Sequence, residues 1–295
     1  MTRFDIQRVR RDMEAVVQYM SNILDDVLAE HKLLSEAADD HGHGREDKDK
    51  DKDKDFLQIL SELQGEAKSE LSGIGLPQLK SMIQDIILGG TDTTTTTVEL
   101  AMAEMLRNPR LLSKAQAEVS EVVGADSIVE EHHLPKLHYI QAVIKEVLRL
   151  HPPAPLLVPR RPSEAATVGG YTVPANSKII INAWDIHRDP SHWDSPLEFR
   201  PERFLPDGGA EKCDYTGNVF HYIPFGSGRR ICPAVPLAER MMAYFLASLL
   251  HSFDWNLPPG QDTIDMSVHV GIVLRKKVPL RLIPTPRLSH PHLYC

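Results

Sequence analysis

One cysteine, Cys232, stands in a local sequence that favours its thiolate form. It ends the run FGSGRRIC at residues 225–232, where glycines and two arginines precede it, and an apolar helix is expected over residues 237–251. Nearby cations and a helix N-terminus lower the pKa of a cysteine. Glycines let backbone N–H groups approach an anion closely. The pattern therefore predicts a stabilised thiolate at this position.

Several uses of such a cysteine are compatible with these residues. A lone thiolate with backbone donors suits a haem iron as an axial ligand, but a single cysteine before a helix is more often an inert core residue. Zinc has less support, because Cys213, Cys232 and Cys295 lack C-x-x-C spacing and the histidines are scattered. A nucleophilic role would require a base that the sequence does not identify.

The wider pattern around Cys232 resembles the haem-binding loop of the cytochrome P450 superfamily, F-x-x-G-x-R-x-C-x-G. Its positions are filled here by Phe225, Gly228, Arg230 and Cys232, with Ala234 where the family usually has glycine. The resemblance implies that the chain binds haem b, iron protoporphyrin IX. It also implies that Cys232 is the axial thiolate ligand of the iron, the ligand that favours O–O bond cleavage.

The resemblance covers nearly the whole chain and implies its fold. Residues 1–295 are similar to the C-terminal part of a single P450 domain of the plant microsomal A-type, so we expect a mainly α fold with small β-sheets, truncated at the N-terminus. Residues 77–107 correspond to the long oxygen-binding helix, and residues 224–251 to the haem-thiolate loop and the following helix. Residues 39–55 alternate Asp and Lys and are expected to form a disordered charged loop.

Hydrophobic periodicity and turn residues predict the individual elements. Helices are expected over residues 4–32, 56–63, 77–107, 109–123 and 137–150. Strands are expected over residues 167–173, 178–184, 268–274 and 280–283, the first interrupted by Gly169 and Gly170. Helices therefore dominate, with small peripheral sheets.

Glycines and threonines interrupt the centre of the long helix, from Gly89 to Thr97. Each glycine costs roughly 1 kcal/mol relative to alanine and each threonine about half of that, and such local conflict tends to mark functional sites. Close packing of the glycines against a neighbour is an equally open explanation. In the family that the chain resembles, this run lies over the distal face of the haem. The resemblance implies that Gly90 leaves room for O₂ and that Asp92 and Thr93 handle protons.

Two oppositely charged residues, Glu146 and Arg149, share a helix face through their i, i+3 spacing. An exposed salt bridge is the default interpretation, but apolar residues surround them and indicate a buried helix. Together with the run FRPERF at residues 199–204 they resemble the E-x-x-R and P-E-R-F motifs of the family. The resemblance implies a buried triad of Glu146, Arg149 and Arg203 that locks this helix to the segment before the thiolate loop.

The same resemblance assigns the arginines and the pocket. In the family, arginines at the positions of Arg160 and Arg230 bind the haem propionates, and paired Arg–carboxylate hydrogen bonds give the physical reason. A surface arginine is the alternative for Arg160. Apolar linings suit a hydrophobic substrate, and the candidate lining residues are Leu156, Leu157, Val158 and Ile272.

Composition limits the partners and the location. The net charge of −8 gives no electrostatic support for a nucleic-acid partner. Three cysteines, an odd number, argue for a reducing compartment rather than a disulfide framework. Full-length members of the family are anchored to the endoplasmic reticulum membrane, whereas no run of about 18 apolar residues is present here. We therefore expect no anchor in this chain and a cytoplasmic or undefined location.

These features predict a haem-thiolate monooxygenase. The resemblance implies insertion of one oxygen atom from O₂ into a small hydrophobic substrate, a terpenoid or phenolic secondary metabolite. The electrons would come from NADPH through NADPH–cytochrome P450 reductase. Two other hypotheses remain: an inactive truncated fragment, favoured by the start of the chain within a domain, and a haem-binding module without turnover, disfavoured by the Asp92–Thr93 pair.

Overall fold

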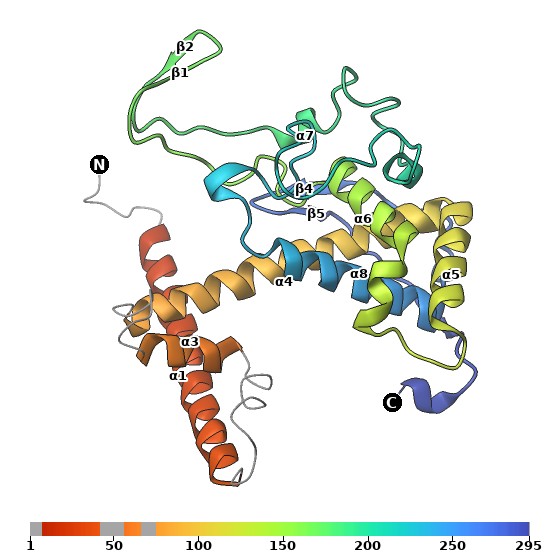
Figure 1. Ribbon diagram of the computed structural model, residues 1–295, viewed down its shortest axis with the longest axis horizontal. Helices are drawn as coiled ribbons and strands as arrows, with labels where there is room; N and C mark the ends of the chain where they lie inside the picture. The colour runs from red at the N-terminus through yellow and green to blue at the C-terminus, as the bar shows by residue number, and fades with distance from the viewer. Residues whose placement is uncertain (1–7, 42–55, 66–74, 295) are drawn as a thin grey trace. The chain divides into compact units, whose positions relative to one another are not determined.

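A computed structural model describes residues 8–41, 56–65 and 75–294 of the chain. The chain divides into two compact units, residues 1–89 and residues 90–295. The boundary falls within helix α4 (Leu76–Arg107), whose observed bounds agree with the predicted long helix over residues 77–107. Figure 1 shows the helices and strands of both units.

The first unit contains α1 (Val9–His41), α3 (Phe56–Gly65) and the beginning of α4. Leucine and isoleucine side chains from all three helices form its small core: Leu24, Leu60, Leu79 and Ile83. Helix α1 extends further than the predicted residues 4–32. It includes residues 39–41, so the expected charged loop is wrong for these three residues, and the rest of it, residues 42–55, lies outside the described residues.

The second unit is organised around a core shared by the last part of α4 and three further helices. Its helical elements are α5 (Pro109–Val123), η1 (Glu131–Lys136), α6 (His138–Leu150), α7 (Ala183–Ile186), η2 (Pro201–Phe204), η3 (Gly228–Arg230), α8 (Val235–Ser252) and η4 (Pro291–Tyr294). Helix α8 contacts both α5 and α6 (Figure 1). Leu100 of α4, Ile140 of α6 and Leu246 of α8 are fully buried in this core, which therefore fixes the helices that carry the candidate site.

Three two-stranded antiparallel sheets lie among the described residues of this unit. They pair β1 (Ala166–Val168) with β2 (Tyr171–Val173), β3 (Phe253–Asn256) with β6 (Ile283–Pro286), and β4 (Val268–Val270) with β5 (Leu274–Lys276). Gly169 and Gly170 link β1 to β2 with φ angles of 56° and 85°, the positive values that a tight hairpin requires. The expectation of a mainly α fold with small sheets is confirmed.

The predicted strand over residues 178–184 is wrong. Ile179 forms only an isolated bridge with Arg160, and residues 183–186 form the short helix α7. The Asn182 side chain accepts a hydrogen bond from Asp185 N at 3.3 Å and caps that helix. An apolar run of this length does not by itself separate a strand from a helix, and the cap decides it.

The terminal strands also differ from the prediction. Residues 268–274 form a hairpin that turns at Gly271 rather than one strand, β6 begins at Ile283 instead of ending there, and β3 was not predicted.

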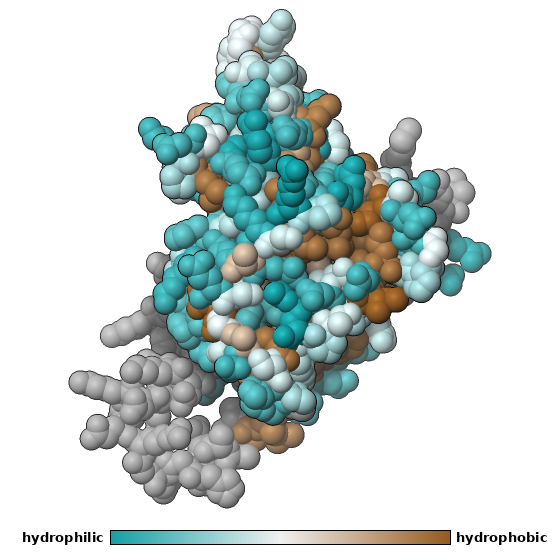
Figure 2. Space-filling view, turned by 90° about the vertical axis from the view of Figure 1, so that its right-hand side faces the viewer, coloured by the Kyte–Doolittle hydropathy of each residue, from teal (hydrophilic) through white to brown (hydrophobic). Residues whose placement is uncertain are grey.

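Among the described residues, no helix is both long and apolar enough to cross a lipid bilayer. Figure 2 shows one face of the molecule, where apolar side chains reach the surface among hydrophilic ones.

Candidate functional site

The candidate thiolate loop closes on itself through backbone hydrogen bonds. Cys232 N donates to Phe225 O at 3.0 Å, and Ile231 N donates to Gly228 O at 3.0 Å. Gly226 and Gly228 have φ angles of 79° and 66°, which residues with a side chain rarely adopt. The half-buried Cys232 thus stands at the end of a tight loop, immediately before α8.

The backbone of Gly217 packs against this loop and accepts a hydrogen bond from it. Ser227 Oγ donates to Gly217 O at 2.6 Å. A Cβ atom at Gly217 would lie 2.7 Å from Gly226 O, so any side chain there would push the loop away. Sequence reasoning missed Gly217, because its neighbours Thr216 and Asn218 indicate an ordinary turn and nothing about a distant partner.

The structure brings Arg160 to the same loop. Arg160 Nη2 donates to Arg230 O at 3.3 Å, and a Cβ atom at Gly226 would lie 3.5 Å from that nitrogen. The Arg230 residue is exposed. Leu157, with a φ angle of 48°, also approaches Gly226, its Cδ1 atom being 3.9 Å from the same Cβ position. The Arg160 guanidinium and one candidate pocket residue, Leu157, therefore lie against the loop that contains Arg230.

The other candidate pocket residues are strongly exposed. The exposed fractions are 42% for Leu156, 70% for Val158 and 96% for Ile272. Ile272 lies in the turn between β4 and β5. Apolar side chains of this size are usually buried, so their exposure leaves apolar surface available for a ligand.

The glycine–threonine run forms part of the continuous helix α4. Thr95 Oγ1 donates to Thr91 O at 2.9 Å, and Thr97 Oγ1 donates to Thr93 O at 2.8 Å, so these hydroxyls are satisfied within the helix. No described atom outside the local helix backbone lies within 4 Å of a Cβ placed at Gly90. Close packing against another part of the described chain therefore does not explain that glycine.

Asp92 forms an ion pair with Arg275 of strand β5. The two side chains are 44% and 56% exposed, respectively. This contact joins α4 to the hairpin that carries Ile272. The sequence did not predict Arg275, since 183 positions separate it from Asp92.

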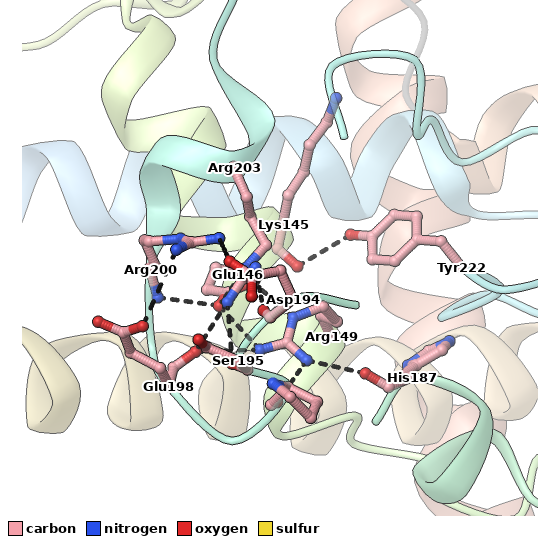
Figure 3. A network of polar contacts seen from close by, with 11 residues as sticks. Lys145, Glu146, Arg149, His187, Asp194, Ser195, Glu198, Arg200, Arg203 and Tyr222 are labelled. Carbon is pink, nitrogen blue, oxygen red and sulfur yellow. Dashed lines mark hydrogen bonds and ion pairs between the residues drawn. The ribbon is translucent and has the colours of Figure 1, made fainter. Parts of the chain in front are cut away.

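Glu146 lies at the centre of a buried ionic network (Figure 3). Its carboxylate accepts hydrogen bonds from Arg149 Nε at 2.7 Å, Arg149 Nη2 at 2.9 Å and Arg203 Nε at 3.0 Å. The Arg200 backbone N–H adds a further donor at 2.9 Å. Glu146 and Arg149 are fully buried and Arg203 is 3% exposed. The structure thus brings the three candidate triad residues together.

Backbone carbonyl groups satisfy the donors that Glu146 leaves over. Arg149 Nη1 donates to His187 O and to Pro196 O, each at 2.8 Å. Arg203 Nη1 donates to Asp194 O at 2.9 Å. Burial lowers the pKa of Arg203, and the neighbouring Glu146 carboxylate opposes that effect. The network therefore joins helix α6 to the residue after α7, to the loop at residues 194–196 and to η2.

His187 connects this network to the thiolate loop. Its side chain is fully buried, and its Nε2 atom accepts a hydrogen bond from Ile223 N at 2.9 Å. Burial, together with the Arg149 and Arg188 cations, lowers the pKa of His187 to about 3. The imidazole is therefore neutral at physiological pH. Sequence reasoning missed His187, because nothing around it resembles a site motif.

This pKa predicts a pH dependence of stability. Between pH 6.5 and about 3 the unfolded state binds a proton at His187 that the folded state does not. The free energy of unfolding should therefore fall on acidification through this window, by up to about 1.4 kcal/mol per pH unit from this residue. Above pH 6.5 the contribution should be constant. Urea unfolding of the wild type and of His187→Gln at each pH measures it: on acidification the free energy of unfolding of the wild type should fall relative to that of the variant, and a difference that does not change with pH would contradict the assignment.

The donor set of the loop fits a haem. Its residue types, one half-buried thiol and two arginines, are those that would hold a haem iron and its propionates. Within the described ranges, no group of three or more His, Cys, Asp or Glu side chains is arranged to hold a metal ion. A zinc site needs such a group of protein ligands, whereas a haem iron needs a single thiolate from the protein.

Comparison with known proteins decides the family. A sequence model described as cytochrome P450 matches residues 1–283. The chain belongs to the cytochrome P450 family. As a cytochrome P450, it is 44% identical over 295 residues to a dimethylnonatriene synthase of Zea mays, covering 98% of this chain and 54% of that protein. It is also 40% identical over 288 residues to a flavonoid 3'-monooxygenase of Petunia hybrida, covering 97% and 54%.

The solved structures agree with this assignment. A zebra fish cytochrome P450 determined with progesterone aligns with a TM-score of 0.75 and 28% identity, covering 96% of this chain and 60% of that chain. The P450 fold is therefore shown directly, as is the predicted family. The chain spans about half the length of the curated relatives it matches.

Proposed function

We propose that this P450 sequence belongs to a haem-thiolate monooxygenase that inserts one oxygen atom from O₂ into a small hydrophobic substrate. The observation that carries the proposal is the closed loop that ends at Cys232 and whose Arg230 carbonyl accepts a hydrogen bond from Arg160. The names of its relatives, a flavonoid 3'-monooxygenase and a dimethylnonatriene synthase, support a phenolic or terpenoid substrate.

The loop residues would hold haem b. Cys232 would bind the iron through its thiolate, while Arg160 and Arg230 would donate hydrogen bonds to the propionates. Phe225 and Gly228 would shape the loop through the Phe225 O–Cys232 N hydrogen bond and the positive φ angle of Gly228. When bound, the haem supplies the reductive activation of O₂.

Helix α4 would supply protons. Thr93 would donate a hydrogen bond toward O₂ in the space that Gly90 leaves open, and Asp92 would pass it protons from solvent. The 44% exposure of the Asp92 side chain supports exchange with water, and its ion pair with Arg275 holds the carboxylate in place. A positioned proton donor of this kind contributes roughly 10²–10⁴-fold to a rate.

The apolar residues Leu156, Leu157, Val158 and Ile272 would line the substrate pocket. The exposure of Leu156, Val158 and Ile272, and the lack of charge on all four residues, support a ligand that binds through apolar area. Electrons would come from NADPH through NADPH–cytochrome P450 reductase, and we propose the endoplasmic reticulum membrane as the site of the whole protein. These two assignments rest on the family alone.

The carbon-monoxide difference spectrum of the reduced, haem-supplemented chain tests the proposal. We expect a strongly red-shifted Soret band, because a thiolate ligand donates electron density to the iron. Reductase-dependent oxidation of a phenolic or terpenoid substrate would then separate an enzyme from a haem-binding module. Absence of haem uptake, or a band typical of histidine ligation, would overturn the proposal and favour an inactive fragment.

A further inference from the structure

Ile223 connects the start of the thiolate loop to the rest of the second unit, in addition to the Ser227–Gly217 and Arg160–Arg230 contacts. Its backbone N–H donates to His187 Nε2 at 2.9 Å, and its carbonyl accepts a hydrogen bond from Gly226 N at 2.9 Å. The next residue, Pro224, has no backbone N–H to donate. The His187 contact therefore fixes the chain where the loop begins.

His187 is itself held on several sides. Its backbone N–H donates to Ala183 O at 2.9 Å, which completes the last turn of α7. Its carbonyl accepts the Arg149 Nη1 hydrogen bond at 2.8 Å. Its ring centroid lies 5.6 Å from that of Tyr222, whose hydroxyl donates to Lys145 O at 3.0 Å. The backbone of His187 is thus held at its N–H and its carbonyl, and its ring packs against Tyr222 (Figure 3).

Hydrogen bonds on the carbonyl and on the ring of His187 join two parts of the second unit through this one residue. One set runs from Glu146 through Arg149 to the His187 carbonyl, and the other from the His187 ring to Ile223 and Gly226. The Phe225–Cys232 hydrogen bond lies within the loop that the second set reaches. Removing the His187 acceptor would leave the Ile223 N–H buried without its partner, which is costly.

We propose that His187 is a positioning residue for Cys232: its imidazole accepts the Ile223 N–H and thereby fixes the thiolate loop to the buried network around Glu146. The proposal rests on the proposed haem-thiolate function only for its effect on the iron ligand. The contact itself can be tested without haem.

The first test compares three substitutions by amide hydrogen exchange in the haem-free chain. In glutamine the Oε1 atom occupies nearly the place of His Nε2, whereas in asparagine the acceptor is one bond shorter, and leucine has none. We expect the Ile223 amide to exchange about tenfold faster or more in His187→Leu and His187→Asn, the factor expected for loss of one hydrogen bond, and to stay near wild type in His187→Gln.

Two controls separate this effect from general destabilisation. His251 is also a buried histidine, 3% exposed, and its ring is hydrogen-bonded to Ser127 O at 2.9 Å. His251→Leu should leave Ile223 exchange unchanged. The Ile140 amide, which donates to Glu118 Oε2 at 3.0 Å, should keep its protection in all the variants.

The second test is the carbon-monoxide difference spectrum of the haem-supplemented variants. His187→Gln should keep the red-shifted band of the wild type, and His187→Asn should shift most of it to the position of non-thiolate haem. Equal spectra for the Gln and Asn variants, or unchanged Ile223 exchange in His187→Asn, would overturn the proposal. If the wild type itself lacks the band, the proposed function fails, and the exchange result alone then decides the role of His187.

Discussion

Replacing Glu146 with alanine is expected to lower the free energy of unfolding by about 3–5 kcal/mol. The substitution leaves Arg149 and Arg203, at 0% and 3% exposure, without the carboxylate that both of them contact. The carbonyl groups of His187, Pro196 and Asp194 would remain as acceptors, but they carry no full charge. Urea unfolding of the 295-residue chain, with the wild type as reference, measures the loss.

Two further substitutions give this prediction its controls. Glu146→Gln keeps acceptor oxygen but removes the charge, so its loss should be smaller than that of the alanine variant. Lys114 pairs with Glu202 at 2.9 Å, but the two side chains are 47% and 40% exposed. Lys114→Ala should therefore cost less than about 1 kcal/mol. A loss for Glu146→Ala as small as that of Lys114→Ala would contradict the buried network.

The elements that sequence predicted best have local signals at both ends. Helix α5 has the predicted bounds of residues 109–123, because Pro109 starts it and Gly124, with a φ angle of 86°, ends it. The predicted strand over residues 178–184 was wrong because a single capping side chain, that of Asn182, favours a helix at residue 183. Proline and glycine at the ends of a segment thus predict where a helix begins and ends. A short apolar run without such residues does not show whether it forms a helix or a strand.

The candidate site divides in the same way. Cys232 and its loop are contiguous in sequence, so their motif could be read directly. His187 is hydrogen-bonded to Ile223, which lies 36 positions away in the sequence. Asp92 is paired with Arg275, which lies 183 positions away. Such contacts depend on how distant backbone segments are placed, which periodicity does not encode. Helical spacing predicted Arg149 as a partner of Glu146, whereas the resemblance supplied Arg203, since neither spacing nor composition links residue 146 to residue 203.

Replacing Cys232 with serine is expected to abolish the red-shifted carbon-monoxide band of the haem-loaded chain. A serine hydroxyl is far less acidic than a thiol and does not supply the anionic sulfur ligand. The substitution adds no volume, and the backbone hydrogen bond from residue 232 to Phe225 O needs no side chain. The loop should therefore keep its shape, and far-UV circular dichroism should be unchanged while the band is lost.

Cys213 provides the matched control for this prediction. It is 3% exposed, its Sγ atom lies 3.6 Å from His221 Nε2, and burial raises the pKa of its thiol to about 11. A thiol that stays protonated at neutral pH is a poor ligand, because metals bind the thiolate. Cys213→Ser should therefore retain the band. If the band survived in Cys232→Ser and disappeared in Cys213→Ser, the ligand would be the buried cysteine, and the loop would have another role. The burial of Cys213 opposes that outcome, since ionising this thiol would place an anion in the aromatic core around Tyr215 and Tyr222.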